Sequence, residues 1–229
     1  MRLDKYVSLA LDLSRAEVKQ LIKQKSIEVN SIVSTDASTE VSQDDVIKYN
    51  GEILKYYDKV YLMMNKPSGY ISATQDEEAT VMDIIPTAYY QKDLKIVGRL
   101  DKDTEGLLII TNDGSFIHEI TSPKKHIAKT YYVEFSGVLV DNASTLVEQG
   151  LQLKNYKTLP SKLEILDDHS LKLTIYEGKF HQVKEMVSSL GAEVTYLKRL
   201  SIGKLALGDL EVGHVRYLTL DELSLIKEE

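Results

Sequence analysis

Hydrophobic and polar positions follow first a helical period and then a strand period in the opening part of the chain. After Ser14, apolar residues recur at helical spacing through residues 15–25, and Glu17 completes a capping box that begins the helix. The pattern then predicts a strand at 27–30 and a hairpin with a type I′ turn at 46–54. This part of the chain therefore favours a small module of one helix and short strands.

The rest of the chain reads mainly as strands, with helices placed irregularly between them. Alternation is clearest where Leu171, Leu173 and Ile175 share one face. Because no regular strand–helix–strand repeat occurs, we expect an α+β domain on a mostly antiparallel mixed β-sheet with flanking helices. The predicted domains are 1–57 and 59–229. The strands are expected at 60–64, 96–97, 107–110, 129–135, 162–166, 171–176, 193–197 and 216–220, and the helices at 81–85, 115–120, 142–149, 182–190 and from 221 onward.

One loop between two apolar strands holds a dense group of charges. Between Gly98 and Gly106, Asp101 lies with two further carboxylates, a lysine and Arg99. Since packed strands hold both ends of such a loop, its charged side chains are held in place. An isolated Arg-Leu-Asp is more often a surface hairpin with salt bridges. Solubility alone does not require two glycines and a threonine to hold this charge between apolar strands, which favours a catalytic role for Asp101.

This stretch, residues 98–114, resembles the signature loop of the RNA pseudouridine synthases. The resemblance implies that Asp101 is the catalytic carboxylate, and that Asp103 and Glu105 support it or face solvent. It also implies that Arg99 contacts the RNA near the reacting nucleotide or braces the loop.

Two further motifs supply partners for this carboxylate. Lys129-Thr130-Tyr131 matches the Lys-Thr-Tyr of the family, which implies that Tyr131 stacks on a flipped uracil. Residues 177–186 resemble the third motif of the family, which implies that Lys184 pairs with Asp101. Many relatives have arginine at this position, which can bind both oxygens of a carboxylate. The lysine of this chain would make only a single point contact. On periodicity alone, Lys184 is as readily expected to lie along the helix surface.

The implied chemistry is the isomerisation of uridine to pseudouridine. It breaks a C–N glycosidic bond, turns the uracil and rejoins it through carbon. It needs an ionised carboxylate that either attacks C1′ or removes the C2′ proton, and the sequence does not choose between these routes. Because neither electrons nor phosphate are transferred, no cofactor is expected, and the chain has no Walker loop.

A basic stripe marks the first module. Arg15, Lys19 and Lys23 recur every four residues on the predicted helix, a spacing that is more often simply a solvated face. The order of residues here resembles an S4 RNA-binding domain, of the α-L type. The family usually has glycine before the strand, where this chain has Lys25-Ser26, which leaves the turn at that point open. The resemblance implies that phosphates are contacted by Arg2, Lys5, Ser14, Arg15, Lys19, Lys23 and Asn30.

Three residues of the second domain are also implied to contact RNA. Lys66 lies in an Asn-Lys-Pro loop that resembles the corresponding loop of the family. Lys179 and His181 lie at the entry of the helix predicted at 182–190, from which they would reach the RNA backbone.

Composition limits the class of protein. The chain has 229 residues and a net charge of −7, which argues against coating nucleic acid non-specifically but allows a local basic face. It has no cysteine, and its five scattered histidines lack metal-ligand spacing, so no metal site is expected. No signal peptide or apolar run of membrane length is found. We therefore expect a cytoplasmic protein, acting as a monomer.

The target RNA follows from finer resemblances. Residues 1–6 and Thr121-Ser122-Pro123 look most similar to the small-subunit branch of the family, which modifies uridine 516 of 16S rRNA. The alternatives are a large-subunit 23S rRNA pseudouridine synthase and a non-catalytic S4-type RNA-binding or ribosome-assembly factor. The presence of Asp101, Tyr131 and Lys184 together argues against the last, because binding alone does not require all three. Whether naked RNA or a partly assembled particle is the substrate stays open.

Overall fold

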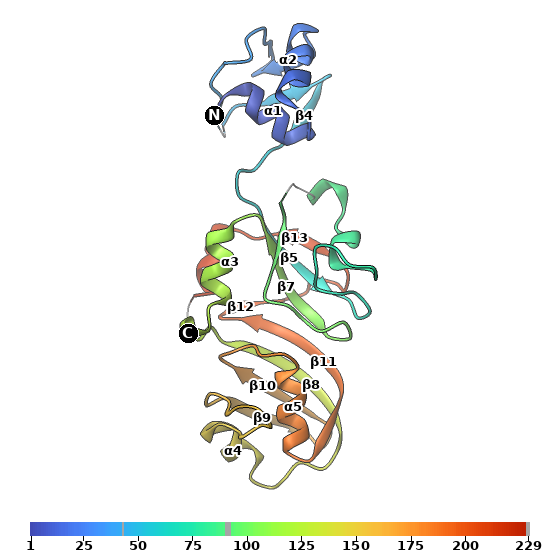
Figure 1. Ribbon diagram of the computed structural model, residues 1–229, viewed down its shortest axis with the longest axis vertical. Coiled ribbons are helices and arrows are strands. Elements are labelled where there is room, and N and C mark those ends of the chain that lie inside the picture. Colours follow the sequence, from blue (N-terminus) through green and yellow to red (C-terminus); the bar gives the residue numbers. More distant parts are fainter. Residues whose placement is uncertain (43, 90–92, 228–229) are drawn as a thin grey trace. The chain divides into compact units, whose positions relative to one another are not determined.

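The chain divides into two compact units, Met1–Lys59 and Val60–Glu229, which are described separately. The computed structural model describes residues 1–42, 44–89 and 93–227 (Figure 1). The division lies next to residue 58, the position that separates the two predicted domains. None of the helices in the described ranges is long and apolar enough to cross a membrane.

The first unit packs two helices against a small antiparallel sheet. The helices are α1 (Leu3–Leu11) and α2 (Arg15–Lys23). The strands lie in the order β2-β1-β3-β4, with bounds β1 (Ile27–Val29), β2 (Ile32–Val33), β3 (Ile47–Tyr49) and β4 (Glu52–Leu54). Both helices and the strands β1 and β3 contribute to its core, which consists of Leu3, Val7, Val18, Ile22, Ile27, Val41 and Ile47.

Local signals in this unit are confirmed where a side chain or a turn fixes the backbone. The Ser14 hydroxyl accepts from the Glu17 amide at 3.3 Å, and the Glu17 carboxylate accepts from the Ser14 amide at 2.8 Å. Asn50 and Gly51 have φ of +51° and +85°, as a type I′ turn requires. Helix α1 is absent from the sequence prediction. Its N-cap residue, Arg2, makes no capping hydrogen bond, so no local signal marks its start.

Lys25 follows α2 in a left-handed conformation, with φ of +58°. Its amide donates to the Ile22 carbonyl at 3.0 Å, and the Ser26 amide donates to the Leu21 carbonyl at 3.2 Å. This is the hydrogen-bond pattern of a Schellman motif, in which glycine is the usual residue. The turn that sequence analysis left open is therefore the glycine-type turn, built with a lysine.

Replacing Lys25 with glycine is expected to raise the free energy of unfolding of the first unit by about 1 kcal/mol, because glycine adopts positive φ without the steric cost. Urea unfolding of the full chain, followed through hydrogen exchange of peptides from α2, measures it. The control is Lys19→Gly, at an exposed position in the middle of α2, which should lower the same free energy by about 1 kcal/mol. Destabilisation by both substitutions would contradict the assignment of strain to Lys25.

The second unit is built on a nine-stranded sheet within the described residues. Seven strands lie in the order β13-β5-β7-β11-β8-β10-β9, while β6 pairs with β7 and β12 pairs with β11. Their bounds are β5 (Tyr61–Lys66), β6 (Lys95–Val97), β7 (Glu105–Thr111), β8 (Lys129–Gly137), β9 (Lys162–Asp167), β10 (Ser170–Ile175), β11 (Ala192–Ile202), β12 (Leu205–Ala206) and β13 (Val215–Tyr217). Among the strands described, β7 and β11 run parallel and the other neighbours antiparallel. The predicted α+β class with a mostly antiparallel sheet is confirmed.

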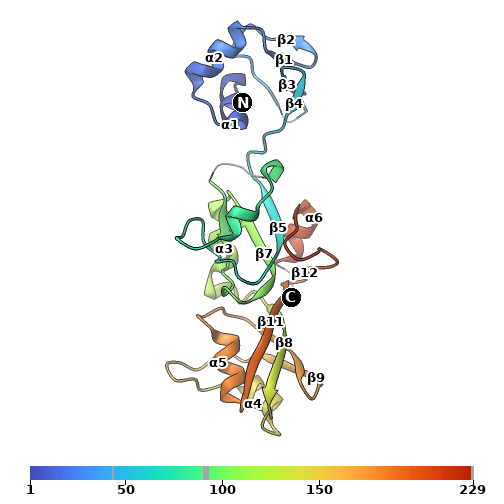
Figure 2. The same cartoon turned by 90° about the vertical axis from the view of Figure 1, so that its right-hand side faces the viewer.

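Helices and short 3₁₀ turns flank this sheet. The helices are α3 (Gly114–Thr121), α4 (Ala143–Gln149), α5 (Gln182–Ser189) and α6 (Leu220–Leu225), and the 3₁₀ turns are Val81–Ile84, Thr87–Tyr89 and Pro123–Lys125. Figure 2 shows α5 beside the long strand β11, and side chains of α5 belong to the largest core cluster. The predicted helix at 81–85 is thus a single 3₁₀ turn. The predicted strand at 193–197 extends to Ile202 as β11.

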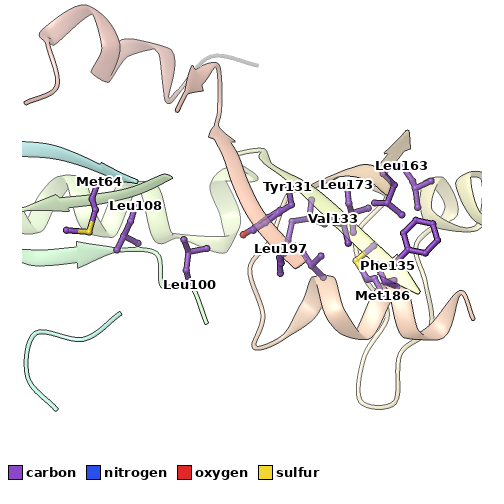
Figure 3. Close-up of a cluster of buried hydrophobic side chains, with 14 of the residues drawn as sticks. Met64, Leu100, Leu108, Tyr131, Val133, Phe135, Leu163, Leu173, Met186 and Leu197 are labelled. Carbon is purple, nitrogen blue, oxygen red and sulfur yellow. The ribbon is translucent and has the colours of Figure 1, made fainter. Parts of the chain in front are cut away.

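The largest core cluster joins the two ends of the sheet. It contains Met64 and Leu108 from β5 and β7, Tyr131 from β8 and Met186 from α5. Figure 3 shows Leu197 beside Tyr131, with the hydroxyl end of the tyrosine directed toward the side where Leu100 lies. The charged loop is therefore anchored on the same core that holds Tyr131.

Candidate active site

The charged loop joins β6 to β7, which pair with each other. Its backbone is held from one side by the segment that follows β5. The Ser72 hydroxyl donates to the Leu100 carbonyl at 2.8 Å and accepts from the Leu100 amide at 3.1 Å. The Gly69 amide donates to the Lys102 carbonyl at 2.8 Å. These bonds fix the backbone on both sides of Asp101.

Lys66 holds the same loop from inside. Its side chain is completely buried, and Nζ donates to the carbonyls of Pro67 at 2.9 Å, Lys102 at 3.1 Å and Thr104 at 2.8 Å. Burial lowers the pKa of Lys66 to about 8. Three acceptors require three N–H donors, which only the ammonium form has. The prediction that Lys66 contacts RNA is wrong, because its side chain is enclosed and its donors are used within the fold.

The start of β7 lies unusually close to β11. Gly106 has φ of +104°, and a Cβ added there would lie 2.3 Å from the carbonyl oxygen of Arg199. Only glycine allows this approach of the two parallel strands. The contact fixes where the end of the charged loop meets the strand that borders the cavity described next.

A cavity of about 230 Å³ opens beside the loop. It collects residues that are far apart in the sequence, since β6, β8, β10, β11 and the entry of α5 all contribute to its wall. Of the predicted site residues, its lining includes Arg99, Asp101, Tyr131, Lys179, His181 and Lys184. The structure therefore brings the predicted catalytic set together at one place.

Asp101 lies beside a lysine amine and a histidine ring. Its side chain is 25% exposed, with Lys184 Nζ 3.6 Å from Oδ2 and His181 Nε2 3.7 Å from Oδ1. Lys184 hydrogen-bonds instead to Asp103, at 2.7 Å from each carboxylate oxygen. The expected pairing of Lys184 with Asp101 is thus an ion pair without a hydrogen bond, and Asp103 is the closer partner. Unlike arginine, lysine has no planar guanidinium that binds both oxygens of one carboxylate, so its amine lies between two carboxylates.

The two carboxylates differ in their surroundings. Asp103 is 69% exposed. Partial burial raises the pKa of its carboxyl, but the hydrogen bonds and charge of Lys184 outweigh this and hold that pKa below its usual value. Glu105, the third acid of the loop, accepts a hydrogen bond from the Tyr196 hydroxyl at 2.7 Å. Of the three acids, Asp101 alone is found in the cavity lining.

Tyr131 and Arg99 occupy different positions in the wall. The ring of Tyr131 is almost completely buried in the core, and its hydroxyl has no hydrogen-bond partner among the residues described. Arg99 is exposed and likewise has no partner in the described ranges. An aromatic ring at the cavity wall and a free guanidinium at its edge are suited to a base and to a phosphate, respectively.

The entry of α5 holds side chains whose placement differs from expectation. His181, expected at the RNA backbone, lies at Asp101 and has a left-handed backbone with φ of +51°. Its ring stacks on Phe180, which is 77% exposed, with 3.7 Å between ring centroids. Lys179 lies with Nζ 3.5 Å from the Tyr156 ring centroid and 3.6 Å from Glu177. Lys179 is therefore engaged within the fold, although it borders the cavity.

Residues of the first unit divide into two groups. Arg2 donates two hydrogen bonds to Asp4, the Ser14 hydroxyl completes the capping box, and the Asn30 side chain bonds Asp45 and the Val46 amide. The geometry gives these three a structural role, while their exposed positions leave the prediction that they contact phosphates as a prediction. The others are exposed and make no hydrogen bond or ion pair among the described residues; they are Lys5, Arg15, Lys19 and Lys23.

Comparison with known proteins assigns the chain to a family. Residues 60–189 match the RNA pseudouridylate synthase family, and residues 1–47 match the S4 domain. The chain belongs to the RNA pseudouridylate synthases and carries an S4 domain at its N-terminus.

Relatives that align over their full length are also named as pseudouridine synthases. The chain is 42% identical to YtzG of Bacillus subtilis, an uncharacterized RNA pseudouridine synthase, over 100% of this chain and 99% of that protein. It is 39% identical to the ribosomal small subunit pseudouridine synthase A of Haemophilus influenzae, over 97% of this chain and 98% of that protein. A crystal structure of a pseudouridylate synthase, 37% identical, superposes with a TM-score of 0.69 over 99% of both chains.

Proposed function

We propose that this chain converts a uridine of small-subunit ribosomal RNA to pseudouridine, with Asp101 as the catalytic carboxylate. The observation that carries the proposal is the position of Asp101, in a cavity wall with an amine 3.6 Å and an imidazole 3.7 Å from its oxygens. The naming of several relatives as ribosomal small subunit pseudouridine synthase A supports the choice of RNA. Residues 59–229 form the catalytic domain, and residues 1–57 dock the RNA.

The proposed reaction begins with a uridine flipped out of its helix into the cavity. Tyr131 supplies a flat surface that offsets part of the lost base stacking. The Asp101 carboxylate either attacks C1′ or removes the C2′ proton, and the C1′–N1 bond breaks. The uracil turns and its C5 bonds to C1′, which expels the Asp101 carboxylate in the first route and is accompanied by return of the proton to C2′ in the second. The C5 proton then leaves and N1 takes up a proton, so atoms and electrons balance without a redox partner.

The charged residues around Asp101 have distinct proposed roles. Lys184 balances the charge of the carboxylate, His181 lies against its other oxygen, and Asp103 holds the Lys184 amine between the two acids. Arg99, exposed at the cavity edge, contacts a phosphate beside the flipped nucleotide. In this account the protein works as a monomer in the cytoplasm, where ribosomal RNA is assembled.

Mapping pseudouridine in 16S and 23S rRNA, from cells with and without this gene, tests the proposal. We expect one 16S position, uridine 516, to lose its pseudouridine when the gene is absent. Loss at a 23S position instead would favour the large-subunit alternative. An unchanged map together with altered ribosome assembly would favour the non-catalytic RNA-binding factor. A second comparison, of naked 16S rRNA with a partly assembled small subunit, identifies the substrate.

Reversing charge on α2, with Arg15→Glu and Lys19→Glu together, is expected to weaken RNA binding and flatten its salt dependence. Both side chains are exposed and unpaired in the described structure. If each neutralises one phosphate, the slope of log affinity against log salt should shrink by about 1.4 to 1.8. Filter binding at a series of salt concentrations measures the slope.

The matched control is Lys48→Glu with Lys55→Glu, which changes the net charge equally but lies on and beyond the sheet of the same unit. It should leave the slope within about 0.5 of the original value if binding depends on specific phosphate contacts. Equal slopes for the two double variants would remove α2 as the docking face.

A further inference from the structure

Arg199 is a buried cation with no counter-ion among the residues described. Its side chain is 1% exposed. Nε donates to the Leu107 carbonyl at 2.8 Å and Nη2 to the Gly98 carbonyl at 3.1 Å, while Nη1 has no protein partner in the described ranges. A buried guanidinium without an anion is costly, because desolvation is not repaid by an ion pair. Such a residue in a cavity wall is suited to receive an anion.

Lys129 provides a second cation in the same wall. It lies on β8 two residues before Tyr131, and so on the same face of that strand, while Tyr131 is the register partner of Arg199. Lys129 Nζ donates to the Ile127 carbonyl at 2.8 Å and has no carboxylate partner in the part of the chain described. Burial, and secondly the charge of Arg199, lower the pKa of Lys129 to about 8. Both cations line the cavity that holds Asp101.

The proposed reaction creates one anion in this cavity besides Asp101. When the C1′–N1 bond breaks, the bonding electron pair stays on N1, and the uracil leaves with its charge shared over N1, O2 and O4. This holds for both routes, since attack at C1′ and removal of the C2′ proton each expel the base with that pair. Cations fixed in a cavity before the reaction stabilise a charge that develops only during it.

We propose that Lys129 and Arg199 form an anion subsite that takes up the negative charge of the departing uracil. The proposal rests on the proposed function and deepens it. Tyr131 then lies against the face of the base, while Lys129 and Arg199 meet its oxygens or N1. The subsite also selects uracil over cytosine, because an amino group in place of O4 would present hydrogens to cations.

Substituting Lys129 tests the proposal, because this side chain is less buried than Arg199 and its loss should leave the fold intact. The rate of loss of the original nucleoside in a single turnover is measured on two RNAs of the same sequence, one with uridine and one with 5-fluorouridine at the target. Fluorine withdraws electrons, which stabilises the uracil anion without help from the protein. Nuclease digestion and mass spectrometry follow the disappearance of the target nucleoside.

For Lys129→Met, we expect the rate on uridine RNA to fall about 100-fold or more, as for loss of one preorganised donor. The fall on 5-fluorouridine RNA should be at least about tenfold smaller. Lys129→Arg should restore most of the rate, and RNA affinity should stay within about threefold for both variants. The control, Lys162→Met, removes an exposed lysine of β9 outside the cavity and should leave all rates unchanged.

Three outcomes overturn the subsite. Equal slowing on both RNAs shows that Lys129 does not contact the charged base. A Lys129→Arg variant as slow as Lys129→Met shows that the positive charge of Lys129 is not what matters. A defect confined to RNA affinity assigns Lys129 to a backbone phosphate instead. Failure of the proposed function itself looks different, because the unaltered protein would then convert no uridine in any RNA tested.

Discussion

Substituting Gly106 with alanine is expected to cost the catalytic domain at least about 3 kcal/mol of its free energy of unfolding, from steric overlap and strained φ together. The added Cβ would lie 2.3 Å from the Arg199 carbonyl oxygen and 2.7 Å from its amide nitrogen. Neither atom can move away, because both belong to the backbone of β11 where it pairs with β7. With total stabilities of about 5–15 kcal/mol, such a loss removes much of the folded population.

Urea unfolding followed through hydrogen exchange of β7 peptides measures this loss. Gly69→Ala is the matched control, since Gly69 also has a positive φ, +90°, but a Cβ there meets no atom within 4 Å. Its cost should be limited to the backbone strain, about 1–2 kcal/mol. If the two alanine variants are equally destabilised, the close approach of β7 and β11 is not what glycine provides.

Much of the architecture follows from local sequence. The capping box at Ser14, the turn at Asn50 and the α+β class all depend on residues close together in the chain, and the structure confirms them. The strands around the charged loop were also predictable, because Ile96 and Val97 precede it and residues 107–110 follow it. Structural features that depend only on neighbouring residues can be predicted from the sequence pattern.

Contacts between distant segments could not be predicted in this way. Lys66 looks like any basic loop residue, yet it binds carbonyls 36 and 38 positions further along the chain. Lys184 reaches Asp103 across 81 positions, and no local pattern says which of two nearby acids it chooses. Lys129 lies in the Lys-Thr-Tyr motif, but only the fold shows that it shares a cavity wall with Arg199 and that neither has a counter-ion among the described residues. These features depend on the packing of β11 against both β7 and β8.

Replacing Asp101 with asparagine is expected to abolish pseudouridine formation, with a fall of at least about 10⁴-fold, because asparagine neither attacks C1′ as an anion nor accepts the C2′ proton. RNA affinity should change by less than about threefold, because asparagine is nearly the same size as aspartate and the proposed phosphate contacts remain. Complementation of a strain lacking the gene, together with filter binding of the purified variant, measures both. Modification by Asp101→Asn at an ordinary rate would contradict the catalytic assignment.

Asp103→Asn is the matched control, because Asp103 lies two positions after Asp101 and pairs with the same lysine. Asp103→Asn removes the hydrogen bonds that hold the Lys184 amine, but leaves the carboxylate of the cavity in place. We expect its rate to fall by about tenfold, as for a residue that positions another.

The most direct measurement follows the C5 hydrogen, which leaves only when C5 bonds to C1′. RNA with tritium at C5 of uridine is mixed with excess protein, and tritium released to water is counted. We predict release by the unaltered protein, slower release by Asp103→Asn, and none above background by Asp101→Asn. Tritium release by Asp101→Asn above background would contradict the placement of the reaction at Asp101.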